Sequence, residues 1–232
     1  MAERAAPIWP NYFLSAGLRR AGLLVLSISA LLFYFWLAQS VQAGSTLAFD
    51  THIRAAIHRH NSPALTWFMR YATHFGAPII LSAATIAAVI FFIWKGWYRA
   101  AVLLLVDMVG VPFFNAYLKT YNHRMRPSAF FGVILPTTYS FPSGHALSAF
   151  CFYGMVVGLL SARINDRRSR FAIWLMGAIL TATVGISRVY LGVHYPSDVI
   201  GGYAAALVWV SMLLVFDQNE QRGDVHSLVQ NY

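Results

Sequence analysis

Six apolar stretches, each close to the length of a membrane-spanning helix, constrain this chain more than any other feature. The hydrocarbon core of a bilayer is about 30 Å thick, so a helix rising about 1.5 Å per residue needs roughly 20 residues to cross it. Lipid offers no partner to an exposed peptide group, and a helix bonds its own. The stretches occupy residues 22–42, 75–94, 100–118, 145–162, 171–187 and 199–216. We therefore expect an all-α, polytopic membrane protein with six transmembrane helices, in one domain over residues 1–232.

The composition excludes the main soluble classes. Hydrophobic residues make up 58% of the 232 residues and charged residues only 11%, whereas a soluble domain carries roughly 25% charged residues. The formal charge of +9 would suit a nucleic-acid partner, but such a protein gathers its cations on one soluble face. Here they separate apolar runs, so no nucleic acid is expected. The single cysteine, Cys151, excludes an intramolecular disulfide and is expected to pack as a small hydrophobic residue.

Residues 44–74, between the first two spans, are amphipathic rather than spanning. Apolar Phe49, Ile53 and Ile57 recur every four residues, which predicts a short helix lying on the membrane surface. Ser62 can cap a second short helix, and Pro63 can open it. The apolar face of that second helix would hold Leu65, Phe68 and Ala72. We interpret the segment as an interfacial connector with solvated charges; a lid or lipid gate over a site is the alternative.

Basic residues predict the orientation, because short loops rich in Lys and Arg stay in the cytoplasm. Ten cations fall on one side of the predicted topology: Arg4, Arg19, Arg20, Lys95, Arg99, Arg163, Arg167, Arg168, Arg170 and Arg222. Seven fall on the other side, in longer loops. Both termini are therefore expected in the cytoplasm. A cleavable signal peptide competes for residues 22–42, but this run is longer than a signal core and ends in bulky aromatic residues, so we expect a retained helix.

Three polar clusters interrupt the apolar chain, and the expected topology puts all of them on the outer side. The clusters are Lys119 to Arg126-Pro127, Pro142-Ser143-Gly144-His145, and Ser187-Arg188 with His194 and Asp198. Alternate loops of a polytopic protein share a side, so segments far apart in sequence can meet in one pocket. The sequence therefore predicts a single site at the extracytoplasmic membrane face.

The residue types in these clusters suit a phosphate group. A phosphomonoester carries up to about two negative charges. Without a divalent metal it needs fixed cations, which Lys119, Arg126 and Arg188 would supply. Ser143 and Gly144 begin a helix, where free amide groups and the helix dipole favour an anion. We expect these five residues to bind phosphate, and we predict neither a metal site nor a cofactor.

Two histidines and an aspartate provide the groups for nucleophilic and acid–base chemistry. His194 is the candidate nucleophile, whose ring nitrogen would attack phosphorus. Asp198 would hold the other ring nitrogen, fixing the tautomer and stabilising positive charge on the ring. His145, from a different helix, would protonate the departing lipid oxygen and later take a proton from water.

The three clusters resemble, at every fixed position and spacing, the signature of the type 2 phosphatidic acid phosphatase and vanadium haloperoxidase superfamily. The resemblance is to its integral-membrane lipid phosphatases from bacteria, and the motif core covers residues 119–198. It implies metal-independent hydrolysis of a phosphomonoester or diphosphate on a membrane lipid, through a phosphohistidine on His194. It also implies a location in a bacterial inner membrane. Undecaprenyl diphosphate, phosphatidylglycerol phosphate, phosphatidic acid and a lipid A phosphate would all fit as the substrate.

Two other functions stay open at this point. The same intermediate could pass its phosphoryl group to a second lipid, which would make the protein a phosphoryl transferase. A non-enzymatic lipid transporter or scramblase would use the basic mouth without chemistry. Neither the lipid head group nor the oligomeric state follows from the sequence.

The remaining polar and small residues have structural interpretations. Asp107, inside the third span, is expected to be a protonated or hydrogen-bonded packing residue. His123 and Arg124 are expected to lie in a solvated loop. A close helix contact is expected at a set of small residues, Gly201, Gly202, Ala205 and Ala206.

Overall fold

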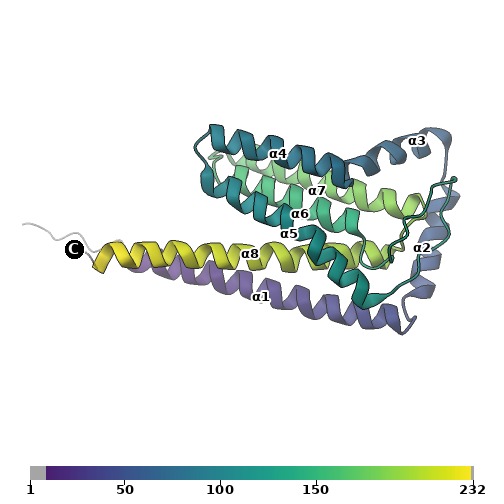
Figure 1. The fold of residues 1–232 in the computed structure, drawn as a ribbon, viewed down its shortest axis with the longest axis horizontal. Helices are drawn as coiled ribbons and strands as arrows, with labels where there is room; N and C mark the ends of the chain where they lie inside the picture. Colours follow the sequence, from purple (N-terminus) through teal and green to yellow (C-terminus); the bar gives the residue numbers. More distant parts are fainter. Residues whose placement is uncertain (1–8, 231–232) are drawn as a thin grey trace, which may run out of the picture.

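The computed structural model describes the backbone of residues 9–230 and the side chains of residues 17–217, and within that part every regular element is helical (Figure 1). The elements are α1 (Trp9–Gln42), α2 (Leu47–Arg59), α3 (Pro63–Ala72), the 3-10 turn η1 (Thr73–Gly76), α4 (Pro78–Trp94), α5 (Tyr98–Asn122), α6 (Gly144–Ser161), α7 (Arg167–Tyr190) and α8 (Pro196–Gln230). The predicted all-α class is confirmed.

Five of the described helices, α1 and α5 to α8, are long and apolar enough to cross a membrane. Helix α4 adds a sixth span if it is taken together with α3 and η1, from which it bends by 52°. Large apolar side chains point outward along these helices; Ile79 is 83% exposed, Phe113 75% and Phe171 69%. Such a surface is unfavourable in water and suits lipid. The chain is therefore an integral membrane protein, and its predicted spans correspond to α1 and α4 to α8.

Several helix ends differ from the predicted ones, and two of the differences affect the polar clusters. Helix α4 begins at Pro78, after η1, because proline lacks an N–H and suits the first position of a helix. Helix α5 continues past residue 118 until His123 takes a left-handed φ of 50°. Helix α7 likewise continues past residue 187. Lys119 thus lies in the last turn of α5, and Arg188 lies in the last turn of α7 rather than in a loop, which restricts the movement of both.

Helix α1 lies along α8 (Figure 1), and both surround a buried core to which α5 and α6 also contribute. Tyr34 from α1 and Cys151 from α6 meet in this core, so the cysteine packs as a small hydrophobic residue, as predicted. A retained first helix fits the structure, because α1 supplies part of the core. Asp107 is fully buried, and its Oδ1 accepts a hydrogen bond of 2.9 Å from Trp209 Nε1. This bond joins α5 to α8 and agrees with the packing role predicted for Asp107.

Two glycines let α8 approach the start of α6. A Cβ on Gly202 would lie 2.7 Å from the backbone oxygen of Ser143. A Cβ on Gly201 would lie 2.5 Å from the ring of Phe141. The predicted close contact at these small residues is confirmed, and it holds the first turn of α6 next to the first turn of α8.

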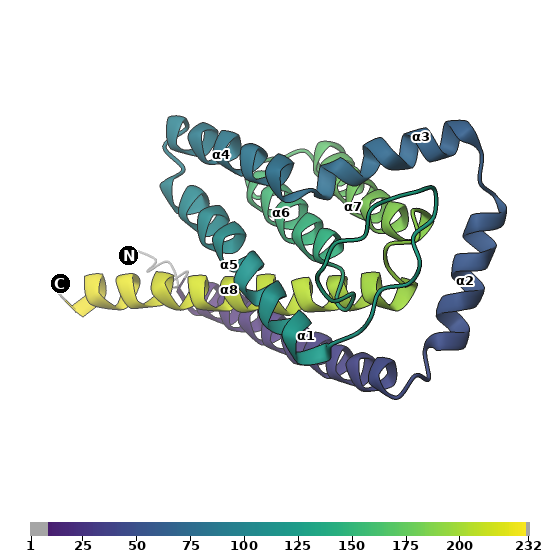
Figure 2. The same cartoon turned by 45° about the vertical axis from the view of Figure 1, so that its right-hand side comes forward.

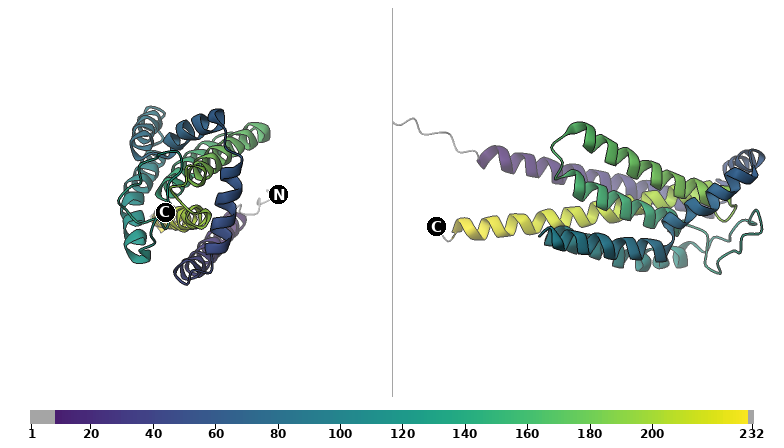
Figure 3. Two further views of the ribbon diagram at one scale, coloured as in Figure 1. Left: turned by 90° about the vertical axis from the view of Figure 1, so that its right-hand side faces the viewer. Right: turned by 90° about the horizontal axis from the view of Figure 1, so that it is seen from above.

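The three polar clusters lie at one end of the bundle (Figure 2). The 123–143 loop, the α7–α8 turn and helices α2 and α3 share this end, and α2 runs across it, as the end-on view in Figure 3 also shows. The α4–α5 turn and the α6–α7 loop lie at the opposite end. Of the ten cations used to predict orientation, Arg4 and the side chain of Arg222 lie outside the described residues. Six of the other eight lie in or next to the α4–α5 turn and the α6–α7 loop, and Arg19 and Arg20 lie in the first half of α1, which is at the same end (Figure 3).

The predicted amphipathic segment forms helices α2 and α3, with the expected break between them. Ser62 Oγ accepts the amide of Leu65 at 3.2 Å and Pro63 opens α3, so the predicted cap is confirmed. The expectation that this segment carries only solvated charges is wrong. Asp50 in α2 is fully buried, because Arg124 and Ser197 contact both of its oxygens.

Candidate active site

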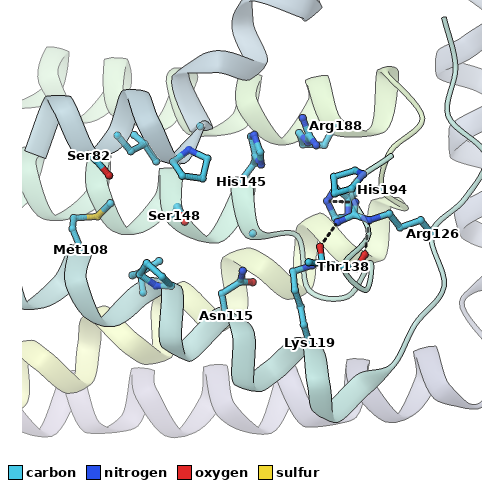
Figure 4. A pocket seen from close by; sticks show the side chains of 17 residues that line it. Ser82, Met108, Asn115, Lys119, Arg126, Thr138, His145, Ser148, Arg188 and His194 are labelled. Carbon is cyan, nitrogen blue, oxygen red and sulfur yellow. Dashed lines mark hydrogen bonds between the residues drawn. The ribbon is translucent and has the colours of Figure 1, made fainter. Parts of the chain in front are cut away.

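A cavity of about 300 Å³ lies where the polar clusters meet, between α4, α5, α6 and the 123–143 loop (Figure 4). Its cationic end carries Lys119, Arg126, His145, Arg188 and His194, and its apolar end carries Leu81, Met108 and Val111. Six of the eight predicted site residues line it, Gly144 included, whereas Ser143 and Asp198 are fully buried behind its wall. The volume is at the lower end of the range for ligand pockets, roughly 300 to 1,000 Å³.

His194 and Asp198 form the predicted pair. His194, in the α7–α8 turn, is 2% exposed, and Asp198, in the first turn of α8, is fully buried. Nδ1 of His194 and Oδ2 of Asp198 are 3.3 Å apart. The same oxygen accepts the amide of Tyr195 at 2.8 Å and the hydroxyl of Ser140 at 2.5 Å. These bonds hold the carboxylate in one orientation, and Pro196 opens α8 just before it.

A contact from Arg126 identifies the tautomer of His194. Nη1 of Arg126 lies 3.1 Å from Nε2 of His194. Guanidinium nitrogens can only donate, so Nε2 is the acceptor and carries a lone pair, while Nδ1 carries the proton that faces Asp198. Burial lowers the pKa of His194 to about 3, against the raising effect of Asp198, so the ring is neutral near pH 7. A neutral imidazole with its lone pair on the cavity side is the form that a nucleophile needs.

Three cations face the cavity without a carboxylate to neutralise them. Lys119 and Arg126 donate to backbone oxygens of the 123–143 loop, and Arg188 Nη1 donates to Thr73 Oγ1 at 2.7 Å. Arg188 Nε is buried and has no partner among the described residues. No ion pair formed by the described side chains includes any of the three cations. The cavity therefore holds an excess of positive charge that an anion would neutralise.

The first turn of α6 supplies further polar groups. Gly144 opens the helix next to Asn115, whose Nδ2 would lie 2.8 Å from a Cβ at this position. The Oγ of Ser143 is buried and has no partner in the described part of the chain. One prediction is wrong here: the Ser143 amide is not free, because it donates to the backbone oxygen of Asp198 at 2.9 Å. That bond forms because the first turns of α6 and α8 are in contact. The Ser143 amide is therefore not available to an anion, and its hydroxyl lies behind the cavity wall.

Asn115 is a cavity residue that the sequence reasoning missed. It lies one turn before Lys119 on α5, and its Oδ1 is buried with no partner among the residues described. Residues four apart share a helix face, so the spacing from Lys119 is the signal that points to it.

The prediction that Arg124 lies in a solvated loop is also wrong. Arg124 forms ion pairs of 2.6 Å with Asp198 and 2.7 Å with Asp50. No local sequence pattern predicts these ion pairs, because the two carboxylates come from distant parts of the chain. His123, in contrast, is exposed as predicted and contacts the Tyr139 ring edge-on.

The sequence of this chain is similar to those of known proteins over the region that holds most of the cavity residues. The PAP2 superfamily profile matches residues 100–222, which include every predicted site residue. A phosphatidylglycerophosphatase B of Bacillus subtilis (strain 168) is 30% identical over 198 residues, which cover 84% of this chain and 96% of the relative. An undecaprenyl-diphosphatase of Sulfolobus acidocaldarius is 29% identical over 189 residues, which cover 79% of this chain and 84% of the relative.

A solved structure extends the likeness to the fold. The crystal structure of a transmembrane PAP2-type phosphatidylglycerolphosphate phosphatase from Bacillus subtilis superposes with a TM-score of 0.74 at 28% sequence identity. The match covers 83% of this chain and 96% of that chain. It therefore includes most of the helical bundle as well as the motif core.

Proposed function

This chain belongs to the PAP2 superfamily, and we propose that it hydrolyses a phosphomonoester or diphosphate on a membrane lipid with His194 as the nucleophile. The observation that carries the proposal is the setting of the His194 ring. Asp198 holds Nδ1, and Nε2 faces a cavity with three cations that lack counterions. The relatives are named as lipid phosphatases, which supports the same enzyme class here: a hydrolase acting on lipid phosphates.

In the first step, Lys119, Arg126 and Arg188 hold the phosphate in place of a metal. Arg126 moves its donor from Nε2 of His194 to a phosphate oxygen, which frees the lone pair. Nε2 then forms a bond to phosphorus while the bond from phosphorus to the lipid oxygen breaks. Asp198 stabilises the positive charge that develops on the ring. His145, protonated once the anionic phosphate is bound beside it, gives its proton to the departing oxygen.

In the second step, water attacks the phosphohistidine. His145, now neutral, takes a proton from that water as the new oxygen–phosphorus bond forms. The bond from phosphorus to Nε2 breaks, and inorganic phosphate leaves with His194 restored to its neutral form. Both steps use the same two histidines, so the site returns to its starting protonation state.

The test is phosphate release from several lipid phosphates by the purified protein in detergent, with and without EDTA. We expect equal turnover in both conditions, because Lys119, Arg126 and Arg188 supply the positive charge. In residues 17–217, no group of three or more His, Cys, Asp or Glu side chains is arranged to hold a metal ion. Loss of turnover in EDTA would contradict the metal-independent mechanism. Labelled phosphate in an acceptor lipid, with little free phosphate, would instead indicate a transferase.

We also place the cavity at the extracytoplasmic face of a bacterial inner membrane, with both termini in the cytoplasm. The support is that the eight described cations of the predicted cytoplasmic set lie in or next to the α4–α5 turn and the α6–α7 loop, or in the first half of α1, away from the cavity. The same assay on sealed, right-side-out vesicles tests the orientation. A short-chain lipid phosphate added outside should be hydrolysed without detergent. Activity that requires permeabilised vesicles would reverse the assignment.

Among the candidate lipids, the cavity favours one whose phosphate is joined to glycerol. Asn115 and Ser148 lie between its cationic and apolar ends, and Ser82 lies beside Met108 at the apolar end (Figure 4). A buried acceptor without a donor, such as Asn115 Oδ1, costs about 1–3 kcal/mol. A hydroxyl of a glycerol head group, as in phosphatidylglycerol phosphate, would donate to it. An isoprenyl chain joined directly to a diphosphate has no hydroxyl at that place.

Asn115→Leu is therefore expected to lower kcat/KM for phosphatidylglycerol phosphate about tenfold, because the head-group hydroxyl loses its acceptor. The value for undecaprenyl diphosphate should change by less than about twofold. The two rates are measured as phosphate release from mixed micelles. Ala116→Leu, at the exposed neighbouring position on α5, is the matched control and should leave both rates unchanged. Equal losses on the two lipids would contradict the glycerol assignment.

A further inference from the structure

We propose that Asp50 and Arg124 are positioning residues that orient Asp198 and strengthen its effect on His194. The inference rests on the proposed role of His194 as the nucleophile. A continuous chain of contacts runs from Asp50 in α2 through Arg124 in the 123–143 loop to Asp198 in α8, and it ends at the His194 ring. Neither Asp50 nor Arg124 lines the cavity, so both act through Asp198.

Arg124 is the bridge in this chain of contacts. Its Nη1 donates to Asp198 Oδ1 at 2.6 Å, and its Nη2 donates to Asp50 Oδ2 at 2.7 Å. The guanidinium is 12% exposed and both carboxylates are fully buried. A planar fork of this kind binds two carboxylates in fixed directions. Because Arg124 takes Oδ1 of Asp198, the other oxygen is left to face His194.

Asp50 is anchored by the residue that precedes Asp198. Its Oδ1 accepts the amide of Ser197 at 2.9 Å, and its Oδ2 accepts the Ser197 hydroxyl at 2.7 Å. The same hydroxyl accepts a hydrogen bond of 2.7 Å from Arg124 Nη1. Asp50 therefore fixes the first turn of α8 and the Arg124 side chain together, although it belongs to the first loop.

The signs of the three charges explain why Asp50 matters for chemistry. Arg124 alone would neutralise much of the charge of Asp198 and weaken its support for a positive His194 ring. Asp50 offsets the charge of Arg124, so Asp198 keeps more of its effect on His194. The other titratable groups near the His194–Asp198 pair come from all sides: Arg54 (α2), Lys119 (α5), Arg126 (123–143 loop), His145 (α6) and Arg188 (α7). Each of these is a cation or a histidine, so Asp50 and Asp198 supply the negative charge at this end.

The two residues have opposite expected effects on His194. Asp50→Asn removes a negative charge, which disfavours a positive ring, so kcat should fall about tenfold with KM within about twofold of the wild type. Arg124→Gln removes a positive charge and raises the pKa of His194. The reaction needs the neutral ring, which is lost as the pH falls through that pKa. The acid limb of kcat should therefore move to higher pH by about one unit in Arg124→Gln. In Asp50→Asn it should not move to higher pH.

The experiment measures kcat, KM, the pH dependence of kcat and inhibition by inorganic phosphate for these variants in detergent. Arg124→Lys keeps the positive charge but loses the two guanidinium nitrogens that bind Asp198 and Asp50 together. The acid limb of this variant should stay at the wild-type pH, while its kcat should fall below that of the wild type. Inhibition by phosphate should be unchanged in every variant, because the cations that line the cavity are intact. Asp217→Asn is the matched control, since it breaks a 2.6 Å ion pair with Arg99 in the half of the bundle away from the cavity, and it should behave as the wild type.

A purely structural role would lower the amount of folded protein or raise KM without moving the acid limb, and that result would overturn the proposal. Should the charge variants fail to fold, Ser197→Ala is the milder test, because it removes a hydroxyl that is hydrogen-bonded to both Asp50 and Arg124. We expect kcat to fall about threefold at constant KM; wild-type kcat in folded Ser197→Ala would also overturn the proposal. A wild-type protein that hydrolyses no lipid phosphate would instead refute the proposed function itself.

Discussion

Replacing His194 with alanine is expected to lower kcat for lipid phosphate hydrolysis by at least about 10⁴-fold. The variant removes a ring nitrogen whose lone pair faces the cationic cavity and whose other nitrogen is held by a buried carboxylate. His145, the second histidine of the cavity, forms no ion pair with a described carboxylate and cannot take over this role. Initial rates of phosphate release from a radiolabelled lipid measure the effect.

The intermediate offers a second measurement on the same variant. Rapid quenching of the wild type during turnover should trap a phosphorylated protein that is labile in acid, as a phosphohistidine is, and His194→Ala should trap none. His60→Ala is the control, because His60 is exposed at the end of α2 and should keep wild-type turnover. Unimpaired hydrolysis by His194→Ala would refute the proposed mechanism.

Asp198→Asn is expected to lower kcat about 10³-fold or more, with KM changed by less than about threefold. The amide nitrogen of asparagine would donate to Nδ1 of His194, whereas the carboxylate of Asp198 accepts a hydrogen bond from it. The proton would then move to Nε2, which removes the lone pair from the cavity side, and the positive charge formed during attack would lose its support. The cations that bind phosphate are not touched, so binding should survive.

Steady-state rates over a range of lipid concentrations separate the two parameters. Asp166→Asn is a suitable control, because Asp166 also accepts hydrogen bonds at the start of a helix but lies before α7, in the α6–α7 loop at the other end of the bundle. Its kcat should match the wild type. A large rise in KM for Asp198→Asn at normal kcat would show that Asp198 serves binding rather than the chemical step.

The helical spans and the main site residues could be predicted because each depends on local properties. The length of an apolar run decides whether it spans a bilayer, and Lys119, Arg126 and Arg188 stand out as cations next to such runs. The exact ends of α5 and α7 could not be predicted, because helix ends depend on single residues such as His123 with its left-handed φ.

The contacts of Asp50 and the position of Asn115 in the cavity could not be predicted for a different reason. Asp50 is an acidic residue in an amphipathic loop helix, where a solvated charge is the usual outcome, and only its contacts with Arg124 and Ser197 explain why it is buried. Asn115 is one polar residue on a lipid-embedded helix, and its importance follows from facing the cavity with an oxygen that has no partner among the described residues.

The sequence by itself determined that the chain is a membrane bundle with a cationic, histidine-containing cluster, because apolar run length and residue type are properties of short segments. Only the tertiary structure decided which nitrogen of His194 faces the cavity and which oxygen of Asp198 is taken by Arg124. These outcomes depend on contacts between residues 68 to 147 positions apart. Such contacts exist only after α2, the 123–143 loop and α8 have packed together, so no local pattern could specify them.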